Sequence, residues 1–493
     1  MSKKIAVVGG GTAGWMSALM AQTHYPSCTV TLIESKNIGI LGAGEGTTPH
    51  FINFLDEVRI PITDIAKECK LSFKFGINFE NWTDGGSYYH AFNTNQTLDP
   101  FAFEQGAVAN FAQGHEVHLD QFQIQPQLNN SNKALATFKD SYLNGGNKIF
   151  SVDFLSQWGV HFDARLLADA LKRIGISRGI VHIEDEVKDT EVVNGNITSL
   201  ILSNDVKIST DFVFDCSGFR REFIGKLFKS EWHSYSDFLP MKSAVPFFIE
   251  HDNDVPAMTS AIAMDYGWVW KIPVQGRYGC GYVFDSDYIN KDQALEEASK
   301  LFGQEIKSDK VFSFNAGCYK DVMIGNCVAI GLSQGFVEPL EATSLWVSYM
   351  TLKDLMHIGI FADKTEEDVK HFNKLCFDRN SGIADFIHIH YLGQKKSSPF
   401  WTEFSEKNKT PDSAKEIIEK YKRGTINSLQ NPYFSELSYS SVLSGVGFKC
   451  GSNFRPKANT YMVRAFLNNQ QRLASQCMSH KCLMDWLSNE DNF

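Results

Sequence analysis

The stretch GWVWKIP (267–273) carries two tryptophans that are one residue apart. Alternation of large apolar residues predicts a strand, and a period of two places Trp268 and Trp270 on the same face. Pro273 is expected to end this strand, because proline has no N–H to donate. The two indoles form either an ordinary core surface or one wall of a site that handles aromatic molecules.

A lysine stands inside an aromatic segment, LSFKFGINFENW (71–82). At period two, Phe73, Phe75, Ile77 and Phe79 share one face of a strand, so Lys74 is expected on the opposite face. Taken alone, this pattern favours a solvated lysine on an amphipathic strand.

The N-terminal segment is typical of a strand, a glycine turn and a helix, in KIAVVGG, GGGTAGW and MSALMAQTHY. Gly9, Gly11 and Gly14 fit the G-x-G-x-x-G pattern, in which the N-terminus of the helix faces a pyrophosphate. A second strand, CTVTLIES, ends at Glu34, about 20 residues after the last glycine, where a carboxylate that binds ribose belongs. The segment predicts dinucleotide binding.

Two later segments favour FAD as the dinucleotide. Residues 181–221 are typical of a meander of short strands that turns at Asn194-Gly195 and ends in DCSG (215–218). A strand at Cys327–Ile330 is followed by a loop and a helix that is expected to begin near Pro339. A site built from distant parts of the chain suits the long FAD molecule better than a nicotinamide cofactor.

Composition narrows the class of protein. The chain has 493 residues, 43% of them hydrophobic, and a formal net charge of −10. No run of lysine and arginine suggests nucleic acid as a partner. We recognise no targeting segment or membrane span, and the ten cysteines form no CxxC pair, so we expect a cytoplasmic protein. Cys477, His480 and Cys482 lack a second ligand pair, so no metal site is expected.

These patterns predict an α/β protein with an FAD-binding, Rossmann-like (GxGxxG) fold of the flavoprotein monooxygenase type and a mostly helical C-terminal substrate module. We expect the FAD-binding domain over residues 1–380 and the helical module over residues 381–493. The polar region at about 85–146 is expected to form inserted loops that cover the substrate. There His90 and Phe92 are candidate pocket walls, although His90 suits a surface loop equally well.

Seven motifs together resemble the flavin-dependent tryptophan halogenases, in the order in which that family carries them. They are GGGTAGW (9–15), GEGTTP (44–49), FKFGINFENW (73–82), WGVHFDA (158–164), GWVWKIP (267–273), GFVEPLEATS (335–344) and SPFW (398–401). The resemblance covers most of the chain and implies the family's FAD-binding halogenase fold.

The resemblance also implies roles for the matched residues. Lys74 matches the catalytic lysine, and Glu341 matches the carboxylate that stabilises a cationic arenium intermediate and takes its proton. Trp268 and Trp270, together with Pro273, match the tunnel wall that keeps the organic substrate away from the flavin.

The halide position and the cofactor contacts are implied in the same way. The halide site falls at Thr343 and Ser344, where many members of the family have glycine at the second position. The implied FAD contacts are Gly9, Gly11, Thr12, Ala13, Gly14, Glu34, Ala43, Glu45, Val187, Leu332 and Leu345.

The implied reaction uses FADH2 from a separate flavin reductase. Reduced flavin and O2 form a C4a-hydroperoxide, which oxidises chloride, bromide or iodide to hypohalous acid. This acid reaches Lys74, which delivers the halogen to an electron-rich indole- or phenol-type substrate. The preferred halide and the oligomeric state, including a homo-oligomer, stay open.

Three other functions are compatible with parts of the pattern. An aromatic monooxygenase shares the cofactor chemistry but needs neither Lys74 nor the indole wall. A non-catalytic flavin-binding protein would show no oxygen chemistry, and an FAD-dependent reductase of prenyl chains leaves the halide loop unexplained. Within the halogenase interpretation, free tryptophan is expected to be a poor substrate, because NPYFSELSYSSVLSGVG (431–447) matches only loosely the cluster that holds the amino acid's backbone.

Overall fold

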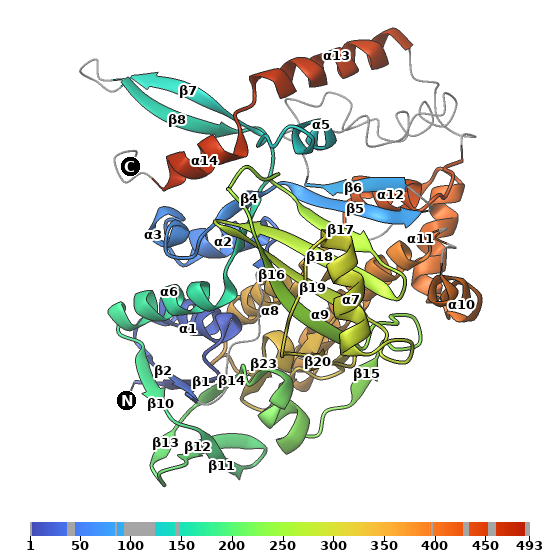
Figure 1. Ribbon diagram of the computed structural model, residues 1–493. Helices are drawn as coiled ribbons and strands as arrows, with labels where there is room; N and C mark the ends of the chain where they lie inside the picture. The colour runs from blue at the N-terminus through green and yellow to red at the C-terminus, as the bar shows by residue number, and fades with distance from the viewer. Residues whose placement is uncertain are drawn as a thin grey trace. The chain divides into compact units, whose positions relative to one another are not determined.

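A computed structural model describes residues 2–36, 45–83, 86–92, 124–142, 148–393, 395, 398–426, 433–451 and 460–488 (Figure 1). The chain forms two compact units, each built from three segments: residues 1–69, 162–236 and 315–383 in unit 1, and residues 70–161, 237–314 and 384–493 in unit 2. The units interleave along the sequence, whereas the expected domains, 1–380 and 381–493, are contiguous. Among the described residues, no helix is long and apolar enough to cross a membrane.

Unit 1 is organised by a six-stranded sheet with the strand order β10-β2-β1-β14-β23-β22. The first five strands run parallel and β22 is antiparallel to β23. Their apolar sequences are typical of parallel strands covered on both faces. The strands are β1 (Lys4–Val8), β2 (Thr29–Glu34), β10 (Val181–Glu184), β14 (Phe212–Asp215), β22 (Met323–Ile324) and β23 (Cys327–Ala329).

Helices cover this sheet, and α1 contacts β1, β2, α6 and α8 (Figure 1). The predicted strand, turn and helix at the N-terminus and the predicted Asn194-Gly195 turn between two strands are confirmed. The helices are α1 (Thr12–His24), α2 (His50–Glu57), α3 (Thr63–Ala66), α6 (Ala164–Ser177), α8 (Ser344–Ile358) and α9 (Glu366–Tyr391), the last of which continues into unit 2. The smaller elements are β11 (Val187–Val193), β12 (Asn196–Leu202), β13 (Lys207–Ser209), β15 (Trp232–Ser234), β21 (Gly317–Tyr319), β24 (Gly335–Phe336), and the short helices η3 (Gly218–Arg220), η4 (Glu222–Leu227) and η5 (Gly331–Ser333).

The helix that was expected near Pro339 begins five residues later, at Ser344. Pro339–Glu341 forms a single 3-10 turn, η6, and the next residue, Ala342, takes a φ of 54°. A residue in this left-handed region cannot continue a right-handed helix, so the backbone breaks there. Thr343 is consequently the N-cap of α8.

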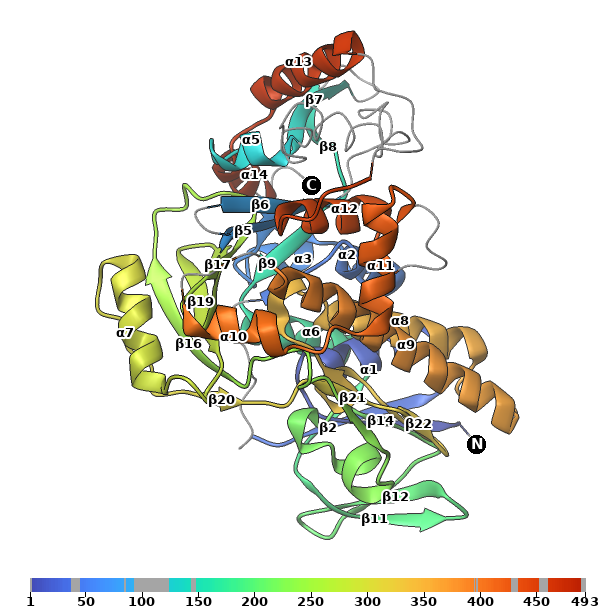
Figure 2. The ribbon, with the colours of Figure 1, turned by 90° about the vertical axis from the view of Figure 1, so that its right-hand side faces the viewer.

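Unit 2 contains a seven-stranded sheet with the order β20-β16-β19-β18-β17-β5-β6, in which only β17 and β5 are parallel to each other. Helix α7 lies against β16 and β19 and covers an apolar core around Val269 and Tyr282 (Figure 2). The elements are β5 (Gly76–Thr83), β6 (Gly86–Ala91), β16 (Ser243–Glu250), β17 (Thr259–Ala263), β18 (Gly267–Val274), β19 (Arg277–Phe284), β20 (Phe312–Ser313) and α7 (Lys291–Phe302).

Pro273 lies inside β18 and does not end it, contrary to the expectation. It pairs with Tyr278 of β19 on one side. On the other side, β17 pairs with β18 only as far as Lys271, so Pro273 occupies a position that lacks a second partner strand. Proline is tolerated at such an edge position because no ladder bond is lost there.

The aromatic segment 71–82 is not one amphipathic strand. It divides into β4 (Ser72–Lys74) and β5, and the break falls at Phe75, directly before Gly76, which has a φ of 153°. A Cβ at Gly76 would lie 2.6 Å from the carbonyl oxygen of His90, so glycine is required for this approach. Both faces of the segment are buried from Leu71 to Phe79, and the expected polar face does not exist.

The described part of the region 85–146 contains regular elements in addition to loops, which corrects the expectation of loops alone. Residues 93–123 lie outside the described part. His90 lies on β6 and is buried, so the surface-loop alternative is excluded. The remaining elements of unit 2 are α5 (Gln125–Asn129), β7 (Ala136–Tyr142), β8 (Lys148–Phe154), β9 (Gly159–Phe162, which reaches the boundary of unit 1), α10 (Pro399–Lys407), α11 (Asp412–Lys422), α12 (Glu436–Gly445), α13 (Thr460–Gln476) and α14 (His480–Leu487).

Candidate active site

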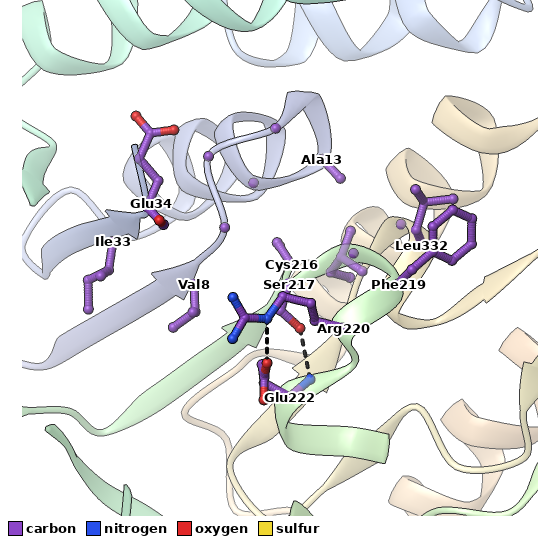
Figure 3. A pocket seen from close by; sticks show the side chains of 18 of the residues that line it. Val8, Ala13, Ile33, Glu34, Cys216, Ser217, Phe219, Arg220, Glu222 and Leu332 are labelled. Carbon is purple, nitrogen blue, oxygen red and sulfur yellow. Dashed lines mark hydrogen bonds and ion pairs between the residues drawn. The ribbon is translucent and has the colours of Figure 1, made fainter. Parts of the chain in front are cut away.

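A cavity of about 340 Å³ lies in unit 1 beside the carboxyl ends of β1 and β2 (Figure 3). This edge of a parallel sheet is the usual ligand position in α/β folds. Most of the residues predicted to contact the cofactor line it: Gly9, Gly11, Thr12, Ala13, Gly14, Glu34, Val187, Leu332 and Leu345. Ala43 lies outside the described residues, and Glu45 opens the two-residue strand β3 (Glu45–Gly46).

The glycine turn fits a dinucleotide closely. A Cβ at Gly9 would lie 2.0 Å from the carbonyl oxygen of Cys216, and one at Gly14 would lie 1.9 Å from the oxygen of Gly9, so both glycines permit close backbone packing. A Cβ at Gly11 would meet no atom within 4 Å, so this backbone is open for a pyrophosphate to approach. Gly11 is also the N-cap of α1 and offers no side-chain cap, which leaves the first N–H groups for phosphate oxygens.

Glu34 is held at the end of β2 by two basic side chains. Its Oε1 lies 2.8 Å from Lys172 Nζ and 2.7 Å from His182 Nε2. Its Oε2 lies over the glycine turn, because a Cβ at Gly10 would approach this oxygen to 1.5 Å. Lys172 and His182 were not found from the sequence, because their contact with Glu34 depends on the packing of α6 and β10 and on no local pattern.

The opposite side of the cavity is formed by the segment after β14. Asp215 is the first residue of the DCSG segment, and its buried carboxylate accepts hydrogen bonds from the backbone N–H groups of Ser217, Phe223 and Ile224 at 3.1, 2.9 and 3.0 Å. Cys216, Ser217 and Gly218 line the cavity, as do Phe219, Arg220 and Glu222, which the sequence analysis missed (Figure 3).

Arg220 is the basic side chain among the described residues that line the cavity, which also include the carboxylates of Glu34 and Glu222. Arg220 Nε donates to Glu222 Oε1 at 2.6 Å, so this cation is paired (Figure 3). Burial raises the pKa of the Cys216 thiol to about 12, so the thiol is neutral at physiological pH. The cavity therefore combines backbone donors with a neutral thiol, which suits an anionic pyrophosphate, and the residues present fit FAD.

The N-terminus of α8 adjoins this cavity through Ser344 and Leu345, which line it. The side chain of Thr343 is 1% exposed and makes no capping bond, and its Oγ1 has no hydrogen-bond partner within the described chain. A helix N-terminus with an unused hydroxyl donor is suited to a small anion. Glu341, in the preceding 3-10 turn, is buried.

Lys74 lies in unit 2 with a side chain that is 0% exposed. Its Nζ stands 5.6 Å from the centre of the Phe92 ring. The solvated-lysine interpretation is therefore excluded. Lysine is rarely buried completely, so this position calls for a specific explanation.

Trp268 and Trp270 share one face of β18, as the alternation predicts, and their ring centres are 6.3 Å apart. Trp268 Nε1 donates to Tyr391 Oη at 2.9 Å, whereas Trp270 Nε1 has no hydrogen-bond partner in the described parts of the chain. Gly281 on β19 makes room for Trp270, because a Cβ there would lie 2.1 Å from the indole. The two indoles form a continuous aromatic surface in unit 2.

His90 belongs to a second aromatic group. Its ring lies 5.3 Å from Phe386 and 6.1 Å from Phe434. No group of three metal-binding side chains occurs within the described ranges, and His480 is engaged with backbone groups.

The glycine turn provides a matched pair of variants. Gly11→Ala adds a methyl group in open space, so we expect a folded protein whose FAD dissociation constant rises at least about tenfold. Gly14→Ala forces a contact with the oxygen of Gly9, so we expect a loss of stability of about 1–3 kcal/mol. Flavin fluorescence titration and thermal unfolding separate the two effects. Unchanged FAD affinity in Gly11→Ala would contradict the placement of the pyrophosphate.

Comparison with known proteins identifies the family. Residues 4–460 match the family model of tryptophan halogenases. The tryptophan 7-halogenase RebH of Lentzea aerocolonigenes is 32% identical over 505 residues, which cover 97% of this chain and 92% of RebH.

Two solved structures are 25% identical to this chain. Xcc4156, a flavin-dependent halogenase from Xanthomonas campestris, has a TM-score of 0.87 and the alignment covers 98% of both chains. The tryptophan 6-halogenase SttH from Streptomyces toxytricini has a TM-score of 0.86, with 98% of this chain and 99% of that chain covered. The chain belongs to the tryptophan halogenase family, the flavin-dependent enzymes that halogenate aromatic substrates with reduced FAD, O2 and a halide ion.

Proposed function

We propose that this chain transfers halogen to an electron-rich carbon of an indole- or phenol-type substrate and that Lys74 delivers the halogen. The observation that carries this proposal is the complete burial of Lys74 beside the ring of Phe92. Burial of a lysine is costly, and it is characteristic of lysines that do chemistry.

The cofactor and halide residues belong to unit 1. When bound, reduced FAD supplies the electrons that activate O2, so that a halide can be oxidised to the level of hypohalous acid. The glycine turn holds the pyrophosphate, and Glu34 binds a ribose hydroxyl through the carboxylate oxygen that lies over the turn. Thr343 Oγ1 and the first N–H groups of α8 bind the halide.

Lys74 acts on the oxidised halogen in one of two forms. As an ammonium ion, it donates a hydrogen bond to hypohalous acid and polarises the oxygen–halogen bond. As a free amine, it carries the halogen as a haloamine. In both forms the halogen is held at one atom, so that one carbon of the substrate is attacked.

Glu341 is assigned as the base. Attack by the aromatic ring produces an arenium cation, which a carboxylate stabilises and then deprotonates. Glu341 is buried, which suits this role, because a carboxylate acts more strongly on a cation where water is excluded.

The aromatic residues of unit 2 select the substrate. Trp268 and Trp270 separate the organic substrate from the flavin, and His90 and Phe92 form walls against which a flat ring stacks. The relatives named above act on tryptophan, and we propose an indole or phenol ring here. Free tryptophan is expected to be poorly held, because Phe434, in the segment that matches loosely, stacks on Phe386 at 3.8 Å and is occupied in packing.

The partners and location follow from the same proposal. The sequence carries one G-x-G-x-x-G turn, so a separate reductase is proposed to supply reduced FAD. Both proteins are proposed to act in the cytoplasm, where the cysteines stay reduced.

Lys74→Met keeps the length of the side chain and removes its amine. We expect halogenated product to fall at least about a hundredfold while FAD binding is unchanged. The measurement is the ratio of halogenated product to hydrogen peroxide under steady reduction. Lys271→Met is the control, because this lysine lies on β18 and contacts Tyr278 instead. Equal ratios in wild type and Lys74→Met would refute the role of Lys74.

Glu341→Gln preserves the shape of the side chain and removes its charge. We expect kcat for halogenation to fall by about 10²–10⁴, because a neutral amide neither stabilises the cation nor accepts the proton. Rapid-quench kinetics with FAD affinity as the control would test this. A variant with the wild-type kcat would show that another group is the base.

The halide site is tested at two positions. Thr343→Val removes the buried hydroxyl, and we expect KM for bromide and chloride to rise about tenfold or more, whereas Thr343→Ser should retain the wild-type values. Ser344→Gly should change the ratio of the two halide KM values, because it removes the side chain that lines the cavity. If Thr343→Val leaves both halide KM values unchanged, the anion binds elsewhere.

A further inference from the structure

We propose that Ser72 and His161 are positioning residues that fix the strand of Lys74 against the strand of the two tryptophans. This inference rests on the proposed function of Lys74. It arises from a chain of buried hydrogen bonds within unit 2 that ends on β18.

The hydrogen bonds connect four strands. Ser72 pairs with His161 in the register of β4 and β9. The Ser72 hydroxyl bonds to the carbonyl oxygen of Pro273 on β18 and lies 3.1 Å from His161 Nδ1. His161 Nε2 lies 2.9 Å from Thr259 Oγ1, at the start of β17. The strand of Lys74 is thereby bonded to β9, β17 and β18 through two side chains.

The directions of these bonds follow from the acceptors. The carbonyl of Pro273 can only accept, so Ser72 donates its proton there. The oxygen of Ser72 then accepts the proton of His161 Nδ1, and His161 Nε2 accepts from the Thr259 hydroxyl. The proton on His161 Nδ1 follows from these contacts, and the complete burial of the ring favours the neutral form, in which Nε2 is the acceptor.

A second histidine holds the other side of the same strand. The backbone N–H of Phe73 donates to His480 Nε2 at 3.0 Å, and His480 Nδ1 donates to the carbonyl oxygen of Val255 at the same distance. His480 is therefore also neutral, in the same tautomer. The residue after Lys74 is fixed as well, because the N–H of Phe75 donates to the oxygen of Ala257 at 2.9 Å.

Burial supports the neutral state of both rings. The side chains of His161 and His480 are 0% exposed. Burial and then the charge of Lys74 hold the pKa of His161 well below its ordinary value, and burial lowers the pKa of His480 to about 4. Two neutral imidazoles supply hydrogen bonds without placing a second cation beside Lys74.

The consequence concerns the placement of the lysine amine. Ser72 and Lys74 are two residues apart on β4, and Pro273 is three residues from Trp270 on β18. The bond from Ser72 to Pro273 therefore links the backbone of the lysine strand to the backbone of the tryptophan strand. Loss of this bond would let β4 shift relative to the indoles, and a shift of about 1 Å is enough to impair a positioned catalytic group.

Ser72→Ala removes the link and leaves only a small void. We expect the ratio of halogenated product to hydrogen peroxide to fall about three- to tenfold and the distribution of regioisomers to broaden, with an unchanged FAD dissociation constant. Thr259→Val should produce a smaller change of the same kind, and Thr259→Ser should restore the wild-type ratio. Ser243→Ala is the matched control, because Ser243 is a buried serine on β16, in the sheet that contains β17 and β18.

A purely structural role for Ser72 would lower the unfolding temperature without changing the product ratio or the regioisomers below that temperature, and that result would overturn the inference.

Nitrogen-15 NMR of histidine-labelled protein gives a second readout that needs no turnover. We expect His161 and His480 to be protonated on Nδ1 alone at neutral pH, and an imidazolium or an Nε2–H tautomer of His161 would contradict the network. A wild type that makes no halogenated product would instead refute the proposed function, and the role of the network with it, while NMR would still decide its geometry.

Discussion

The structure depends on the burial of one amine, that of Lys74. Taking an ammonium ion out of water costs several kcal/mol, so the surrounding unit must be arranged to make this position tolerable. Unit 2 does so with aromatic side chains such as Phe92, with neutral histidines, and with backbone hydrogen bonds on both sides of β4. The aromatic segment is divided into β4 and β5 at Phe75, and both of its faces are covered from Leu71 to Phe79.

Unit 1 handles negative charge in a different way. It has two helix N-termini, at Gly11 of α1 and at Thr343 of α8, that no side chain of the N-cap residue caps, and backbone N–H groups at such termini are suited to anions. One of its buried carboxylates, Asp215, accepts hydrogen bonds from backbone donors. The residues proposed to bind anions belong to unit 1, and the lysine proposed to transfer the halogen belongs to unit 2.

Much of the cofactor site could be predicted from the sequence because its determinants are local. Gly9, Gly11 and Gly14 lie within six residues, and their spacing reflects the turn itself. The partners of Glu34 could not be predicted in this way, since Lys172 lies more than a hundred residues away and meets it only through packing of α6.

The surroundings of Lys74 were predicted less well, for two physical reasons. Period-two alternation assigns faces to a strand, but it does not show whether a second layer covers the polar face, and here both faces are covered. His480, which was considered only as a weak metal ligand, binds the backbone of Phe73 from 407 positions further along the chain. The start of α8 was predicted five residues too early because Ala342 adopts a left-handed conformation. Alanine rarely adopts this conformation, so the sequence does not indicate it. The family's motifs identified the lysine, whereas its hydrogen-bonded support required the structure.

A single-turnover reaction of the wild-type protein tests most directly whether this chain transfers halogen to an aromatic ring. Protein with chemically reduced FAD is mixed with O2, an indole or phenol, and equal chloride, bromide and iodide, and the products are analysed by mass spectrometry. We expect ring-halogenated products that require halide and show the isotope patterns of chlorine or bromine, or the mass increase of iodine. A hydroxylated product that forms equally well without halide would contradict this expectation and would favour oxygen transfer to the aromatic ring.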